Sequence, residues 1–182
     1  PVSVISQNED PNLERLSVYA YENLHLLDEL LITAGLSYDY LRFPKNVDAP
    51  PISGGNETED QLSPKLGAIW SPWDDTHFRG AYTRSLGGVY FDNSVRLEPT
   101  QVAGFNQAFR SLIPESVGGL VPGTKFETFG LGWDQSFKTG TYLTVQAELL
   151  TSEGARTIAI MTNSDMSVPV ADSASSARET LD

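Results

Sequence analysis

The sequence predicts an all-β fold, built as an antiparallel up-and-down meander of six to seven strands. Two observations support this prediction. Apolar and polar residues alternate with a period of two in several stretches, as they do in strands with two different faces. Tight connections near 27–28, 73–76 and 138–140 also take turns with long ones at about 44–61 and 87–125. Such wiring puts every short turn on one rim of the sheet and every long loop on the other.

The first predicted strand covers residues 16–24 and follows a polar loop at 1–14. The second, 30–41, is the clearest, because Leu, Ile and Ala alternate with Thr, Gly, Ser and Asp along its length. Its apolar set ends in Tyr38 and Tyr40. Amphipathic rings at the end of an apolar stripe are typical of a lipid-facing surface, where they lie at the level of the headgroups.

Four further strands are predicted along the chain. Residues 44–61 are rich in Pro, Gly and Asn, which predicts a loop before the third strand at 62–70. A tight turn leads into the fourth strand at 78–86. The fifth and sixth strands, 128–137 and 141–150, follow the second long loop and show the same alternation.

The connection at 87–125 is too long to be an idle linker. Glu98 before Pro99 is a helix-start pattern, and apolar residues follow at near-helical spacing. We therefore expect a short helix that packs the loop against the rim, with a lid over a ligand or partner as the functional alternative. The apolar residues are Val102, Phe105, Phe109 and Leu112.

Two interpretations are open after the sixth strand. Residues 153–155 form either a hairpin turn, which would make 156–162 a seventh strand, or a bulge at Gly154 within a strand that continues past it. The bulge is favoured, because it keeps short and long connections alternating. Residues 163–182 are then a loop and the start of a truncated strand.

Composition excludes several classes of function. The 182 residues carry a net charge of −12, which argues against a nucleic-acid surface, because phosphate contacts need clustered Lys and Arg. Without cysteine there is no disulfide and no Cys-ligated zinc. No apolar run approaches the ~20 residues of a membrane helix, but barrel strands need only ~9–11 residues each. No signal peptide is visible, so we expect a processed chain or an excerpt from a longer one.

Alternation alone does not separate a barrel in lipid from a soluble β-sandwich. Three details favour a partial transmembrane β-barrel over residues 15–162. The long loops lie on one rim, small residues such as Gly67 and Gly130 occupy the presumed lumen face, and aromatic residues gather near strand ends. These aromatic residues are Trp70, Trp73, Phe78, Phe137 and Tyr142 by the tight turns, and Tyr38, Tyr40, Phe43 and Tyr82 by the loops.

Four strings in the chain point to a known family. Residues 30–40 end in Gly-Leu-Ser-Tyr-Asp-Tyr, and residues 62–72 read Leu-Ser-Pro-Lys-Leu-Gly-Ala-Ile-Trp-Ser-Pro. Residues 78–85 (Phe-Arg-Gly-Ala-Tyr-Thr-Arg-Ser) and 127–132 (Glu-Thr-Phe-Gly-Leu-Gly) follow. In order and spacing these strings resemble the barrel of TonB-dependent outer-membrane receptors over roughly 15–150. The resemblance implies a bacterial outer-membrane location and a role as a receptor or wall for solute uptake, without catalysis.

Residues 96–109 depart from typical transporters. They look more like barrels at the C-terminal end of tetratricopeptide-repeat outer-membrane proteins of undefined role. The resemblance implies the lipid bilayer, the remaining barrel strands and an external solute as partners, with a plug domain in a complete receptor. Because six or seven strands do not enclose so wide a lumen, we expect the sheet edges to need those further strands.

No residue set indicates catalysis, a cofactor or a metal. His25 and His77 lie beside tight turns, without further ligands at metal-binding spacing. Asp74 and Asp75 are expected to be solvated turn residues rather than an acid–base pair. The acidic loop cluster is expected to be solvated, with a weak calcium site as the alternative. That cluster is Glu57, Glu59 and Asp60.

Polar side chains in the predicted strands would project into the lumen. They would line a channel or contact a plug, or they would only hydrate a wide interior. These residues are Asp39, Lys65, Arg79, Asp134, Gln146 and Glu148.

The alternative hypothesis is a soluble all-β carbohydrate-binding module with three tryptophans as sugar platforms. The location of the aliphatic stripe separates the two hypotheses. A sandwich buries Leu36, Leu66 and Leu131 between two sheets, whereas a barrel leaves them on the outside of one sheet. The tryptophans are Trp70, Trp73 and Trp133.

Overall fold

The computed structural model describes residues 12–46, 53–87, 98–108, 122–157 and 174–181, which form strands and turns. Among these residues we find no helix with the length and hydropathy to cross a membrane. The long strands are β1 (Glu14–Leu27), β2 (Leu30–Asn46), β3 (Ser53–Trp73), β4 (Thr76–Leu86), β7 (Lys125–Ser136), β8 (Tyr142–Thr157) and β9 (Ala174–Leu181). Two short strands, β5 (Gln101–Val102) and β6 (Phe105–Asn106), lie between β4 and β7 in the sequence.

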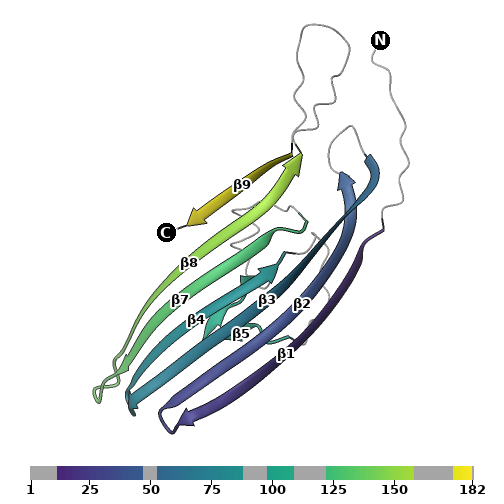
Figure 1. The fold of residues 1–182 in the computed structure, drawn as a ribbon. Helices are drawn as coiled ribbons and strands as arrows, with labels where there is room; N and C mark the ends of the chain where they lie inside the picture. The colour runs from purple at the N-terminus through teal and green to yellow at the C-terminus, as the bar shows by residue number, and fades with distance from the viewer. Residues whose placement is uncertain (1–11, 47–52, 88–97, 109–121, 158–173, 182) are drawn as a thin grey trace, which may run out of the picture.

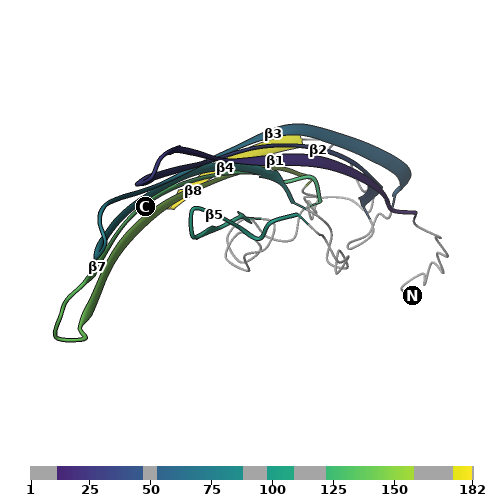
Figure 2. The ribbon, with the colours of Figure 1, turned by 90° about the horizontal axis from the view of Figure 1, so that it is seen from below.

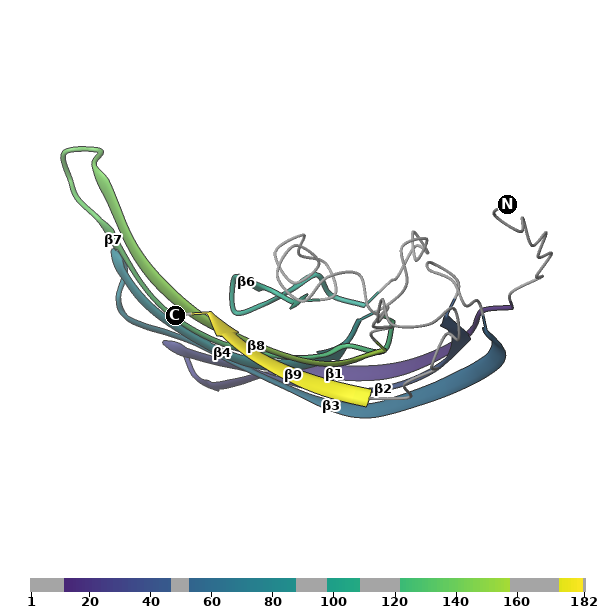
Figure 3. The same cartoon turned by 90° about the horizontal axis from the view of Figure 1, so that it is seen from above.

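The seven long strands form one antiparallel sheet in the order β1-β2-β3-β4-β7-β8-β9. Every long strand therefore pairs with the long strands that precede and follow it in the chain (Figure 1). The sheet is curved, and the β5–β6 hairpin lies on its concave side (Figures 2 and 3). This arrangement confirms the predicted all-β meander and has the form of part of a barrel wall.

The three tight connections lie where the sequence predicts them. Turns at 28–29 and 74–75 join β1 to β2 and β3 to β4, and residues 137–141 join β7 to β8. In the last of these, Gly140 has a φ of +81°, a left-handed conformation that glycine adopts without steric cost. All three turns lie at one end of the sheet (Figure 1).

Several boundaries differ from the prediction. The expected loop at 44–61 is mostly strand, because β2 runs to Asn46 and β3 starts at Ser53 with Pro44 opposite Asn56. β8 passes through Gly154 to Thr157 without a turn, so the predicted continuation of the strand is confirmed. The predicted bulge at Gly154 is wrong, because the pairings of β8 show no register shift there. β9 begins at Ala174, earlier than expected.

The predicted short helix is wrong for the residues described in the second long loop. Residues 101–106 form the β5–β6 hairpin instead, with Val102 opposite Phe105. The two-residue turn Ala103-Gly104 explains the difference, because both residues have positive φ, +49° and +83°, which a helix does not allow. Phe109 and Leu112 lie outside the described residues.

The convex face of the sheet carries the apolar stripe. Leu36, Leu66 and Leu131 are 48%, 52% and 71% exposed, and they lie on this face of β2, β3 and β7. Aromatic residues of the same face also pack side by side, with Trp70 and Phe78 stacked at 5.6 Å between ring centroids. The stripe lies on the outside of one sheet rather than between two, which rules out the sandwich alternative for the described strands.

The concave face is polar and largely covered. Ser37, Asp39, Ser63 and Lys65 are at most 2% exposed on this face of β2 and β3. Two of the aromatic residues predicted to face outward are exceptions. Phe43 is 5% exposed and packs with Leu41 and Leu86, and Tyr142 shares the concave face of β8 with Gln146. The sheet thus inverts the pattern of a soluble domain, because its apolar residues lie on the outer, convex face and its polar residues lie on the inner, concave face.

This inversion predicts that the same charge lowers stability much more on the convex face than on the concave face. Leu131→Arg on the convex face should lower the unfolding free energy of the intact bilayer-folded barrel by about 2–4 kcal/mol, because it puts a cation into hydrocarbon. Gln146→Arg, on the exposed concave face of β8 opposite Gly132, should change it far less. Denaturant titration in lipid vesicles measures both, and equal losses would contradict the assignment of the faces.

Candidate functional site on the concave wall

The β5–β6 hairpin is the element that gives the concave wall its particular shape. Val102 and Phe105 are each 1% exposed, although they belong to a loop between two strands. The hairpin closes on itself through the N–H of Gln107, which donates to the carbonyl of Thr100 at 2.9 Å. Residues 98–108 of the long loop therefore lie on the concave side, with two apolar side chains packed on the wall.

Glycines in the wall make room for these side chains. A Cβ at Gly67 would lie 2.6 Å from Val102 Cγ1, and a Cβ at Gly130 would collide with the Phe105 ring. A Cβ at Gly132 would lie 3.4 Å from the Phe105 ring. The small lumen-face residues predicted from the sequence are thus a seat for the hairpin, since larger residues would exclude it.

Arg79 ties the tip of the hairpin to two strands. Its guanidinium binds the Asp134 carboxylate with two hydrogen bonds, from Nε to Oδ2 at 2.5 Å and from Nη2 to Oδ1 at 3.2 Å. The same guanidinium lies 5.3 Å from the centroid of the Phe105 ring, within the range of a cation–π interaction. Arg79 of β4 therefore links β7 to the hairpin.

A second, buried network holds the base of the hairpin. Lys65 Nζ donates to Gln107 Oε1 at 2.5 Å and lies 3.6 Å from Glu98 Oε1. The Tyr21 hydroxyl donates to Glu98 Oε1 at 2.7 Å and accepts from Gln107 Nε2 at 2.9 Å. The Lys65 and Glu98 side chains are 1% and 2% exposed. Strands β1 and β3 thus meet the loop through one closed set of polar contacts.

Such a buried ion pair fixes position more than it adds stability. Desolvation of two charges offsets most of their attraction, whereas removal of one partner leaves an uncompensated charge and costs about 3–5 kcal/mol. Hydrogen bonds from Tyr21 to Glu98 and from Lys65 to Gln107 surround the Lys65–Glu98 pair and hold the loop base against β1 and β3. The network therefore determines where the hairpin lies on the wall.

Asp39 anchors a further polar group nearer the long-loop rim. It accepts hydrogen bonds from the Ser17 hydroxyl at 2.5 Å and from Arg15 Nη2 at 3.1 Å. Arg15 Nη2 also lies 3.4 Å from the carbonyl of Leu86 at the end of β4. This group connects β1 and β2 to the point where the chain leaves the sheet for the long loop.

Several buried hydroxyls beside these networks have no hydrogen-bond partner. Those of Ser37, Thr83, Ser85 and Thr128 lie on the concave face of β2, β4 and β7, and each residue is at most 6% exposed. An unsatisfied buried polar group costs about 1–3 kcal/mol. These hydroxyls therefore add to the polar character of the concave face and would pair with water or a polar solute that reached them.

The six predicted lumen residues divide into two groups. The structure brings Asp39, Lys65, Arg79 and Asp134 into the networks above. Gln146 and Glu148 of β8 are exposed and lie 3.4 Å apart, Nε2 to Oε2. Sequence reasoning missed Tyr21, Glu98 and Gln107 as contacts of the wall. The available signal was the Glu98-Pro99 pair, which instead led to the prediction of a helix.

The remaining candidates make none of the contacts described above, although His77 lies opposite Asp134 in the β4–β7 ladder. His25, Asp74 and Asp75 are exposed, and His77 Nδ1 lies 2.7 Å from the Ser71 hydroxyl. Glu59 forms an ion pair with Lys125 at 3.0 Å. Among the described residues, no group of three His, Asp or Glu side chains is placed to share a metal ion. The expectation that the chain holds no metal, cofactor or catalytic residue stays a prediction.

Comparison with known proteins shows the family to which the chain belongs. Residues 1–117 match the model of the family described as TonB dependent receptor-like, beta-barrel. The chain belongs to this receptor-like β-barrel family. The match includes β1 to β4 and the described hairpin, so the inward-folded segment is part of the receptor-like barrel. No curated protein and no solved structure matches the chain.

Membership of this family makes the chain a segment of an outer-membrane receptor or transport barrel. The curvature of the sheet, its apolar convex face and its polar concave face agree with that assignment (Figure 2). In the receptor-like barrel the concave face is the lumen wall, and the hairpin lies on it.

A single methyl group tests the fit of the hairpin. Gly130→Ala should lower the unfolding free energy by about 1–3 kcal/mol, because its Cβ collides with the Phe105 ring. The matched control is Gly80→Ala on the neighbouring strand, whose Cβ meets Leu131 Cδ2 at an ordinary 3.6 Å and should cost less than about 0.5 kcal/mol. Denaturant titration measures the unfolding free energy of both variants. An equal loss in Gly80→Ala and Gly130→Ala would contradict the inference that Gly130 makes room for Phe105.

The buried ion pair predicts strong coupling between two residues. Lys65→Met alone should cost about 3–5 kcal/mol, because it leaves the buried Glu98 carboxylate uncompensated, and Lys65→Met with Glu98→Gln should recover much of that loss. Lys125→Met breaks the exposed pair with Glu59 and should cost at most about 1 kcal/mol. A double-mutant cycle measures the coupling, and simple additivity of the two losses would contradict it.

Proposed function

We propose that the chain forms part of the wall of an outer-membrane barrel that takes up an external solute, and that residues 98–108 narrow its passage. The observation that carries this proposal is the inward fold of the loop onto a polar wall whose opposite face is apolar.

The lumen side of the hairpin supports a passage for polar solutes. Thr100, Gln101 and Asn106 are exposed, and Gln101 Nε2 donates to Asn106 Oδ1 at 2.9 Å across the hairpin. The wall side carries the apolar Val102 and Phe105. A solute in the lumen would therefore meet amides and a hydroxyl, whereas the apolar residues hold the hairpin in place.

The edges of the sheet indicate what completes the barrel. In the described part of the chain, β1 and β9 each have one neighbour in the sheet. A free edge presents unpaired N–H and C=O groups, which a bilayer does not tolerate. We propose that further strands of the same barrel pair with both edges, and that the bilayer covers the convex face in the bacterial outer membrane. A plug domain is proposed as a partner of the lumen wall only in a complete receptor.

Removal of the hairpin tests whether it narrows the passage. Residues 101–106 can be deleted with little strain, because Gln107 already hydrogen-bonds to Thr100. In vesicles that contain the intact barrel, the deletion should admit larger neutral sugars, as measured by the rate of vesicle swelling. The control Gln101→Ala with Asn106→Ala keeps the hairpin backbone and should leave the size limit nearly unchanged. A folded deletion variant with an unchanged size limit would refute the role of the hairpin.

A further inference from the structure

A pocket at the short-turn rim is not explained by the lumen wall. It has a volume of about 660 Å³ and lies between the β3–β4 turn and the β7–β8 turn. The N–H of Ser136 donates to the carbonyl of Asp75 at 2.8 Å, which holds the two connections together. The pocket therefore lies between two connections that a backbone hydrogen bond joins.

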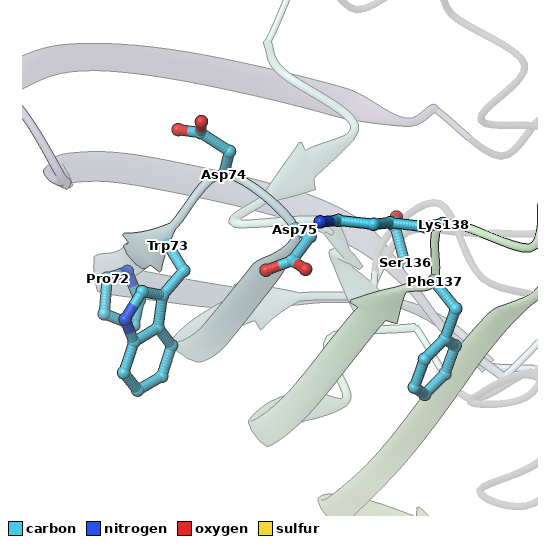
Figure 4. Close-up of a pocket in the computed structure, with 7 residues that line it drawn as sticks. All are labelled: Pro72, Trp73, Asp74, Asp75, Ser136, Phe137 and Lys138. Carbon is cyan, nitrogen blue, oxygen red and sulfur yellow. The ribbon is translucent and has the colours of Figure 1, made fainter.

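Two aromatic rings form the sides of this pocket. Trp73 is 65% exposed and Phe137 is 47% exposed, and both rings point to the same side of the rim (Figure 4). Trp70 and Phe78 continue the exposed aromatic set on the convex face of the adjoining strands. Aromatic rings gather at the level of lipid headgroups, so the pocket opens where the apolar surface of the wall ends.

Charges of both signs line the same pocket. Asp75 and Lys138 lie between the two rings, and Asp74 lies on the other side of the turn (Figure 4). All three charged residues are exposed. An ammonium group beside carboxylates complements a ligand that carries an anion and a hydrogen-bonding cation close together.

We propose that this pocket binds the headgroup of an aminophospholipid from the adjoining leaflet. The Lys138 ammonium would pair with the phosphate, the Asp75 carboxylate would accept hydrogen bonds from the primary ammonium, and the Trp73 and Phe137 rings would pack on the glycerol and upper acyl groups. The proposal commits to a lipid, because the pocket is continuous with the surface assigned to the bilayer. It rests on the proposed function, since only a barrel in a membrane brings the rim to the headgroups.

The test uses the intact barrel reconstituted in vesicles with equal parts of phosphatidylethanolamine, phosphatidylglycerol and phosphatidylcholine. Native mass spectrometry then measures which lipids stay bound after extraction. Phosphatidylethanolamine should be enriched about tenfold over the other two, since one lacks the cation and the other lacks its N–H donors. Lys138→Gln should lower total retained lipid, and Asp75→Asn should abolish the preference over phosphatidylcholine.

The matched control is Lys125→Gln, which removes the same charge at the opposite end of β7. It should retain lipid like the unmodified protein. Equal retention of the three lipids, or an equal loss in Lys125→Gln and Lys138→Gln, would overturn the headgroup site while the barrel stands. Failure of the unmodified protein to insert into any of these vesicles would overturn the proposed function, and the lipid site would fall with it.

Discussion

The inward fold of the long loop depends on the absence of side chains at a few positions of the wall. Gly67 and Gly130 leave room for Val102 and Phe105. A side chain at either position would occupy that space, because even its Cβ would lie too close to the hairpin residue. The apolar residues of the hairpin are buried only because they lie in these gaps. The contacts of Arg79 with Phe105 and of Lys65 with Gln107 follow from that placement, since each joins a strand to the seated hairpin.

The faces of the sheet were predictable because period-two alternation is a local property. Leu36 and Leu66 lie outside and Asp39 and Lys65 lie inside, as the sequence predicts. Phe43 shows the limit of this reasoning. Its aromatic character favours the membrane interface, but the alternation of β2 puts it on the concave face, where it packs with Leu41 and Leu86.

The errors in the loops have definite physical causes. The ends of β2 and β3 near Pro44 and Asn56 carry the Pro, Gly and Asn content of a loop, yet they pair as a ladder. Composition does not distinguish polar strands from a loop where neither face needs to be apolar. In the hairpin, Val102 and Phe105 are three residues apart, a spacing that fits a helix as well as a two-residue turn.

The buried network around Lys65 and Glu98 could not be predicted from any local sequence pattern. Tyr21 and Glu98 are 77 positions apart, and only the meander together with the inward fold brings them to 2.7 Å. Lys65 was predicted to face the lumen, but its partners come from a segment for which the sequence predicts a helix. Topology, rather than residue type, decides which charges meet.

The fit between the glycine gaps and the hairpin has a consequence for how related chains diverge. A larger residue at position 130 leaves too little space for a phenyl ring at position 105, so the two sites can change in size only together. Homologues that retain an inward-folded loop should thus show correlated volumes at these positions. Those whose loop stays outside are free to vary at each one.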